Sequence, residues 1–189
     1  AWDVQGRVYD DLEGVLSYSA RVAGTVGVMM AVLMGERDAD VLARAADMGV
    51  AMQLTNISRD VGEDARNGRL YLPRAWLREA GIDPEAFLAE PQHSDGLALV
   101  LARLLAVADT LYRRADSGLA RLPSRCRPGM YAARLLYSAI GEQLAVRGYD
   151  SVSGRAVVPG VGKLRRLLGL GRLPWLGERD LGAPVLAEN

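Results

Sequence analysis

QLTNISRDVGED, residues 53–64, is the stretch that decides the fold of this chain. Its apolar side chains Leu54, Ile57 and Val61 recur at spacings of three and four residues, the period of one face of an α-helix. The turn residues NGR, at positions 67–69, follow shortly afterwards and are expected to end the helix. The stretch therefore predicts a helix that is buried on one side and ends soon after these residues.

The same helix carries a polar stripe at Gln53, Asn56, Asp60 and Asp64. Because an α-helix turns about 100° per residue, these four side chains fall within an arc of about 80°. Carboxylates beside a buried face are costly unless they are paired, hydrogen-bonded or coordinated. Oxygen donors without histidine or cysteine suit Mg²⁺, with Mn²⁺ as a second candidate, and Arg59 is placed to balance charge or reach a phosphate. A solvated face near the helix end explains the spacing equally well.

Helical periodicity extends over most of the remaining chain, whereas strand signals are almost absent. Gly35 is expected to end one helix and Asp38 to cap the next. We predict an all-α bundle, with one helical domain over residues 1–189. The expected helices cover residues 10–34, 40–65, a short helix at 73–81, a short turn from Pro84, and long helices at 94–122 and 128–147.

The composition narrows the functional classes. The 23 lysines and arginines balance the 23 aspartates and glutamates, so nothing in the overall charge points to nucleic acid. No apolar run approaches the roughly 20 residues that span a bilayer, and no signal peptide is recognisable. The single cysteine, Cys126, fits a reducing compartment such as the cytoplasm and is expected to be structural. The single histidine, His93, lies in a loop-like stretch and is expected to be exposed.

Three glycines inside the predicted helices have more than one explanation. Gly24 and Gly27 leave room either for an apolar ligand or for a neighbouring helix. Gly62 costs about 1 kcal/mol relative to alanine in a helix. It indicates close approach of a ligand or of another backbone, or a tolerated weakness.

Three segments resemble one known family. QLTNISRDVGEDARNGRLYLP, residues 53–73, resembles the second aspartate-rich motif of the squalene and phytoene synthase family. YSARVAGTVGVMM, residues 18–30, resembles the Tyr-x-x-x-Val-Ala-Gly segment that precedes this motif in the family. RLLYSAIGEQLAVRGYD, residues 134–150, is similar to the last core helix of the family. The resemblance implies an isoprenoid-synthase helical bundle around a deep apolar cavity.

The activity implied by the resemblance is the head-to-head joining of two geranylgeranyl diphosphates. The product is phytoene, formed through a cyclopropyl diphosphate with release of two pyrophosphates. Carried over onto this chain, Asn56, Asp60 and Asp64 hold Mg²⁺ against a substrate diphosphate, and Gln53 lines the same site.

The resemblance also assigns roles outside the stripe. Tyr18 corresponds to a tyrosine near the reacting carbons, and Arg21 and Arg59 face the diphosphate. Tyr137 and Arg155 match C-terminal positions near the site. These residue types suit the chemistry, because arginine neutralises a leaving diphosphate and aromatic faces stabilise an allylic cation.

One departure from the family pattern concerns a first aspartate-rich motif, which holds another metal cluster in the family. The acidic pair Asp10-Asp11 instead matches the stretch that follows this motif. The chain therefore resembles the C-terminal portion of a synthase, and we expect these 189 residues alone to lack synthase activity.

Other interpretations remain open. One is an enzyme that makes squalene, dehydrosqualene or presqualene diphosphate; another is a non-catalytic subunit that binds prenyl lipids or scaffolds a partner. The basic segment 163–172 is either a helix on a membrane surface or a solvated C-terminal helix. Surface association is favoured because a phytoene-like product is insoluble in water, so we expect a cytoplasmic protein with peripheral contact to the inner face of the membrane. Nothing in the sequence indicates an oligomeric state.

Overall fold

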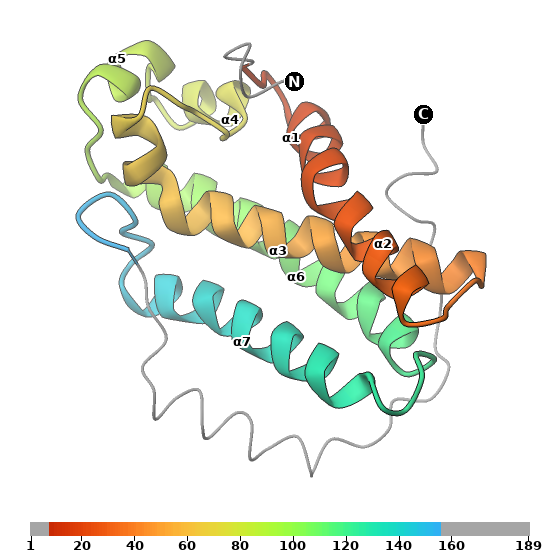
Figure 1. Ribbon diagram of the computed structural model, residues 1–189. Helices are drawn as coiled ribbons and strands as arrows, with labels where there is room; N and C mark the ends of the chain where they lie inside the picture. Colours follow the sequence, from red (N-terminus) through yellow and green to blue (C-terminus); the bar gives the residue numbers. More distant parts are fainter. Residues whose placement is uncertain (1–7, 156–189) are drawn as a thin grey trace.

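Helix α3 (Ala39–Arg66) is the element on which the other helices pack. The computed structural model describes residues 8–155. In Figure 1, α3 runs alongside α6 (Asp95–Leu119), with α7 (Arg127–Val146) on one side and the N-terminal helices crossing on the other. Its 28 residues make α3 about 42 Å long, so it passes from one end of the bundle to the other.

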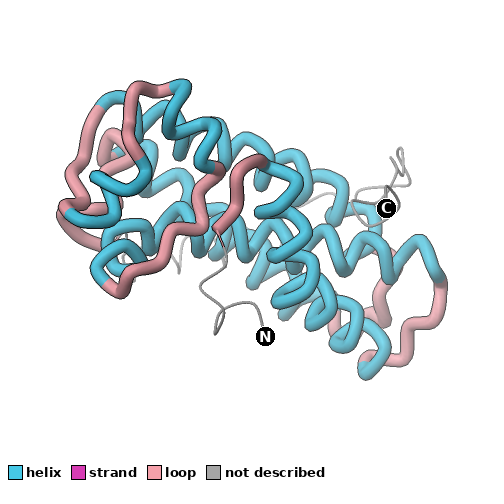
Figure 2. The backbone as a smooth tube through the Cα atoms, turned by 90° about the horizontal axis from the view of Figure 1, so that it is seen from above, coloured by secondary structure: helices cyan, strands magenta, loops and turns pink. Residues whose placement is uncertain are grey.

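The described residues contain helices and loops but no strand, as Figure 2 shows, which confirms the predicted all-α class. The remaining elements are α1 (Leu12–Ser19), the π-helical turn η2 (Ala20–Gly24), α2 (Thr25–Leu33), α4 (Arg74–Glu79) and α5 (Pro84–Ala89).

The ends of α3 follow the sequence signals. The carboxylate of Asp38 accepts hydrogen bonds from the backbone N–H groups of Asp40 and Val41, so Asp38 is the N-cap as predicted. Gly35 has a φ of +98° and follows the last residues of α2. At the other end, Gly68 adopts a φ of +70° and turns the chain away.

The first predicted helix is not a regular α-helix over residues 10–34. It contains the π-turn η2 between α1 and α2, which the sequence analysis missed. A π-turn adds one residue to a helical turn and leaves no distinctive sequence pattern. The third long helix also ends earlier than predicted, at Leu119 rather than at residue 122.

Two glycines allow the N-terminal helices to lie directly against α3. A Cβ atom on Gly27 would lie 2.2 Å from the carbonyl oxygen of Ala45, and one on Gly49 would lie 2.2 Å from that of Ala23. Such distances are impossible for a side chain, so both positions require glycine. Close helix packing is therefore one role of Gly27, which also lines an apolar cavity.

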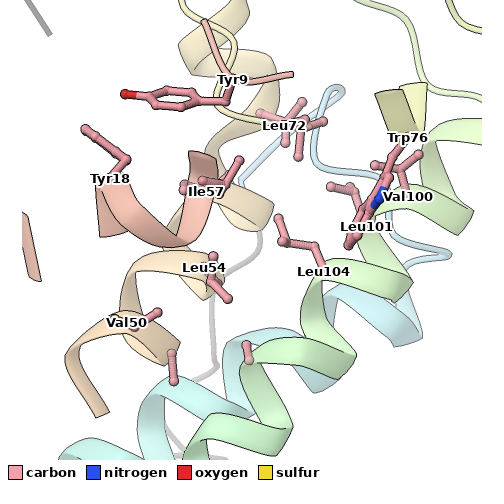
Figure 3. Packing of buried hydrophobic residues seen from close by; sticks show 14 of the residues in the cluster. Tyr9, Tyr18, Val50, Leu54, Ile57, Leu72, Trp76, Val100, Leu101 and Leu104 are labelled. Atoms are coloured by element: carbon pink, nitrogen blue, oxygen red, sulfur yellow. The ribbon is translucent and has the colours of Figure 1, made fainter. Parts of the chain in front are cut away.

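The main core lies between α3, α6 and the short helix α4. Figure 3 shows Leu54 and Ile57 of α3 facing Leu101 and Leu104 of α6, with Trp76 of α4 closing one side. All five side chains are buried. Burial of this apolar face, at roughly 25 cal/mol per Å², is what holds α3 and α6 together.

A charged cluster is buried elsewhere between α3 and α6. Asp47 lies 3.0 Å from a guanidinium nitrogen of Arg44 and 3.3 Å from one of Arg114, and Arg44 and Asp47 are almost inaccessible to solvent. Charges can be buried in this way only when they are paired.

By length and composition, the continuous helix Leu12–Leu33 is long and apolar enough to cross a membrane. The expectation that no apolar segment approaches this length was therefore wrong. The few polar residues in this helix lower its mean hydropathy only slightly. A third of the most apolar stretch is buried in the structure, partly against α3. Helices in the cores of soluble proteins meet the same criterion, so it does not show that this helix spans a membrane.

Gly49→Ala is expected to lower the free energy of unfolding by about 2 kcal/mol, since the new methyl group would force the α3 backbone away from that of Ala23. Urea denaturation followed by circular dichroism measures this change. Gly129→Ala in α7 is the matched control, because a Cβ there meets no atom within 4 Å. It should be neutral or stabilise by up to about 1 kcal/mol. Equal midpoints for the two variants would contradict the close packing.

Candidate functional site

An apolar cavity of about 340 Å³ lies along α3 and is lined on its other sides by η2, α2, α6 and α7. On α3 its lining begins at Val41 and ends at Asn56, a length of about 22 Å. Methionine, valine, alanine and leucine side chains form most of the wall. Gln53, Asn56 and Tyr137 make one end polar, and this end faces the carboxylates of α3.

Asn56 has an incomplete hydrogen-bond set. Its side-chain oxygen Oδ1 is buried and has no hydrogen-bond partner among the described residues. Leaving such an acceptor unsatisfied costs about 1–3 kcal/mol. A cation, a water molecule or a ligand donor at the polar end of the cavity would satisfy it.

Asp60, one turn further along α3, lies between two arginines. Its oxygens accept hydrogen bonds from Arg59 Nε (2.8 Å) and Arg59 Nη2 (2.6 Å). The same two oxygens lie 2.8 Å from Arg155 Nε and 3.2 Å from Arg155 Nη2. The side chain of Asp60 is only 17% exposed. It is therefore a charge-balanced carboxylate inside the protein and not part of a solvated face.

Asp64 is the next carboxylate on the stripe and is half-buried. Burial raises the pKa of Asp64 to about 6, and the neighbouring charges of Asp60 and Glu63 add to the rise. Arg69 and Arg155 act in the opposite direction. The ionised form of Asp64 is therefore only partly compensated by the arginines nearby, and a bound cation would compensate it further.

The segment Asp150–Arg155, here called the strap, crosses the end of α3 at Gly62. The N–H of Gly62 donates to the carbonyl of Ser151 at 3.2 Å. A Cβ on Gly62 would lie 2.7 Å from the Cα of Val152. Gly62 therefore accommodates another backbone, which was one of the explanations open from the sequence, and the strap brings Arg155 to Asp60.

Tyr18 and Arg21 are not among the residues that line the cavity. Tyr18 is buried in an aromatic stack, with its ring centroid 5.1 Å from that of Tyr71 and 5.3 Å from that of Tyr9. Arg21 is exposed on η2. Their predicted roles stay predictions. The contact of Tyr18 with Tyr71, which lies inside the motif at residues 53–73, was not predicted from the sequence.

Several further predictions can be located. His93 is exposed in a loop, as expected. Cys126 is half-buried at the start of α7, and its structural role stays a prediction. The basic segment 163–172 lies outside the described residues.

The residues of the stripe fit a magnesium ion better than a metal cage made by protein alone. Within residues 8–155, no three His, Cys, Asp or Glu side chains are grouped so as to hold a metal. Two carboxylates and one amide, spaced by one turn each, are the hard oxygen donors that Mg²⁺ uses when water and substrate phosphate complete its shell. The orphaned oxygen of Asn56 supports this fit.

Comparison with known proteins identifies the family. The family model described as squalene/phytoene synthase matches residues 1–162. The chain belongs to the squalene/phytoene synthase family. The matched residues include all the predicted site residues of the stripe, the strap and α7.

Curated members of the squalene/phytoene synthase family are similar over most of the chain. A phytoene synthase from Cereibacter sphaeroides is 60% identical over 156 residues, covering 82% of this chain and 44% of that protein. A 15-cis-phytoene synthase from Paracoccus is 45% identical over 185 residues, covering 98% of this chain and 59% of that protein. The chain spans about half the length of the curated relatives it matches.

Solved structures of the family have the same fold. A dehydrosqualene synthase crystallised with a ligand superposes with a TM-score of 0.82 at 29% identity, covering 90% of this chain and 60% of that one. A squalene synthase from Alicyclobacillus acidocaldarius gives a TM-score of 0.72 at 24% identity, covering 78% of this chain and 56% of that one. The isoprenoid-synthase fold predicted from the sequence is confirmed.

Asp64→Asn is expected to stabilise the protein at neutral pH in metal-free buffer. The pKa of Asp64 is raised by folding, so its contribution to stability is fully present below about pH 4 and is lost as the pH rises through about 6. The neutral amide escapes this loss and should be more stable at pH 7–8 by about 1 kcal/mol, allowing for solvent screening.

Urea denaturation of Asp64→Asn and the wild-type protein between pH 4 and pH 8 measures this difference. The two stabilities should converge at the acidic end of the range. Parallel profiles over the whole range would show that Asp64 ionises normally in the folded protein.

Proposed function

We propose that this protein joins two geranylgeranyl diphosphates head-to-head to form phytoene. The carbon–oxygen bond of one diphosphate breaks, and the resulting allylic carbon bonds to the double bond of the second substrate to give a cyclopropyl diphosphate. Loss of the second diphosphate and rearrangement lead to phytoene, with two pyrophosphates and two protons released in all. The observation that carries the proposal is the buried, unpartnered oxygen of Asn56 between an apolar cavity and two carboxylates.

We assign the diphosphate end of the site to the polar stripe and its arginines. Asn56, Asp60 and Asp64 would hold Mg²⁺, or Mn²⁺ in its place, which supplies Lewis-acid stabilisation of the departing diphosphate. Arg59 and Arg155 stand beside these carboxylates and contribute further positive charge. The names of similar relatives, phytoene synthases at 45% and 60% identity, support a diphosphate substrate.

We assign the prenyl chain to the apolar cavity. Its wall of methionine, valine, alanine and leucine side chains binds hydrocarbon through burial of apolar surface. It also keeps water from an allylic cation. Gln53 and Tyr137 at its polar end stand where a diphosphate head and its first isoprene unit would meet.

Location and partners are proposals as well. An apolar product such as phytoene is insoluble in water, which favours a cytoplasmic enzyme with peripheral contact to the inner face of the membrane. The balanced charge of 23 basic and 23 acidic residues gives no support for nucleic-acid binding.

A second candidate function is dehydrosqualene synthesis from two farnesyl diphosphates. The observation that favours it is the superposition on a dehydrosqualene synthase at 29% identity. The two functions use the same chemistry and differ in the length of prenyl chain that the cavity accepts, so a competition between farnesyl and geranylgeranyl diphosphate distinguishes them.

The test uses a chimera, because the chain spans about half the length of its relatives. The N-terminal part of the Cereibacter sphaeroides phytoene synthase is fused to this chain, and the purified protein is incubated with geranylgeranyl diphosphate and Mg²⁺. Phytoene detected by chromatography and mass spectrometry is the expected product. The 189-residue chain alone is expected to form none, and a folded chimera that forms none would contradict the proposed function.

Asp60→Ala in the chimera is expected to reduce phytoene formation at least about a hundredfold, since the diphosphate loses metal-assisted stabilisation. Asp109→Ala is the matched control, because it also removes a carboxylate but from an exposed surface pair with Arg113. The control should retain wild-type activity. Equal activities of the two variants would refute the metal role of Asp60.

A further inference from the structure

We propose that Arg155 and the metal ion compete for Asp60, so that metal loading releases Arg155 from the carboxylate and makes its guanidinium available to the diphosphate. This inference rests on the proposed function, because it takes Asp60 as a metal ligand. It adds an exchange of partners at Asp60, from Arg155 to the metal ion, to the roles proposed for these residues.

The argument begins with the lone pairs of Asp60. A carboxylate has about four acceptor positions. Arg59 and Arg155 each present Nε and Nη2, and together they place four N–H donors within 2.6–3.2 Å of the two oxygens. A bound Mg²⁺ needs one of these positions at about 2.1 Å. One guanidinium must therefore move aside when the metal binds.

Arg155 is the partner that leaves more easily. Arg59 is adjacent to Asp60 on α3, and its side chain is 16% exposed, so its guanidinium is confined. The side chain of Arg155 is 53% exposed, and one of its contacts is the longest of the four, at 3.2 Å. Ion pairs with one well-solvated partner contribute little to stability, so breaking this one costs little.

The backbone of Arg155 is fixed even though its side chain is not. Arg147 Nη1 donates to the carbonyl of Arg155 at 2.9 Å, and Arg66 Nη1 donates to that of Val152 at 3.3 Å. Gly62 holds the strap through its N–H bond to Ser151. The released guanidinium therefore remains beside α3, where a diphosphate bridging the metal would lie.

The exchange predicts positive coupling between metal and diphosphate. Without diphosphate, a binding metal ion has to displace the favourable contact between Arg155 and Asp60. When a diphosphate is present, the displaced guanidinium gains a bidentate phosphate contact instead. By linkage, the diphosphate then raises the metal affinity, and the metal raises the diphosphate affinity by the same factor.

The test measures Mn²⁺ binding to the full 189-residue chain by electron paramagnetic resonance of the free ion, without and with inorganic pyrophosphate. Arg155→Gln is expected to bind Mn²⁺ alone about fivefold more tightly than the wild type. The enhancement of Mn²⁺ affinity by pyrophosphate is expected to fall by a similar factor. An unchanged or weaker affinity of Arg155→Gln for Mn²⁺ alone would overturn the competition.

Arg69→Gln is the matched control for charge. Arg69 is exposed and acts on Asp64 through its charge, but it makes no contact with Asp60. It should leave the pyrophosphate enhancement at the wild-type value. If Arg69→Gln reproduced the behaviour of Arg155→Gln, the effect would be one of general charge and the competition would be rejected.

Asp60→Asn separates failure of this inference from failure of the proposed metal site. If Asp60→Asn weakens Mn²⁺ binding while Arg155→Gln does not strengthen it, the metal site stands and the exchange is wrong. If Asp60→Asn binds Mn²⁺ as the wild type does, or the wild type binds none, the metal site itself is wrong and the exchange falls with it. Circular dichroism of each variant verifies that the helices are retained.

Discussion

Helix α3 has to be buried along most of its length and still present oxygen donors along one arc. Its neighbours α6, η2, α2 and α7 cover it on several sides. Direct backbone packing at Gly49 brings the N-terminal helices close to α3. The backbone of the strap packs against α3 in the same way at Gly62. The polar stripe occupies the part of α3 where the apolar cavity ends, so the carboxylates lie at the boundary between a hydrocarbon-lined space and a cluster of arginines.

The carboxylates at this boundary are compensated within the protein to different degrees. Asp60 is shared by two arginines, whereas Asp64 is half-buried with incomplete compensation, and the buried oxygen of Asn56 has no partner among residues 8–155. A solvated helix face would show none of these features. The exposed neighbour Glu63 does behave as a surface residue. The exposed carboxylate of Glu63 thus differs from the oxygen donors of the stripe, which are buried or partly buried.

Much of the fold could be predicted from local sequence chemistry. Asp38, Ser94 and Asp83 cap their helices through short-range hydrogen bonds, which residue type and position alone indicate. The helical spacing of Leu54 and Ile57 predicted which face of α3 is buried. Three contacts could not be predicted from local sequence because they join residues distant in the chain: the pairing of Asp60 with Arg155, the strap on Gly62, and the burial of Asp47 between arginines of two helices. The family resemblance had placed Arg155 only near the site, and the sequence had left the partner of Gly62 open.

The central claim is that Asn56, Asp60 and Asp64 form one wall of a metal–diphosphate site. Anomalous diffraction from crystals grown with Mn²⁺ and pyrophosphate tests it directly. The account predicts a manganese peak within bonding distance of the Asp60 carboxylate and beside the side chains of Asn56 and Asp64, with Arg155 turned from Asp60 towards the pyrophosphate. A manganese peak elsewhere, with Asp60 still held by both arginines, would contradict it.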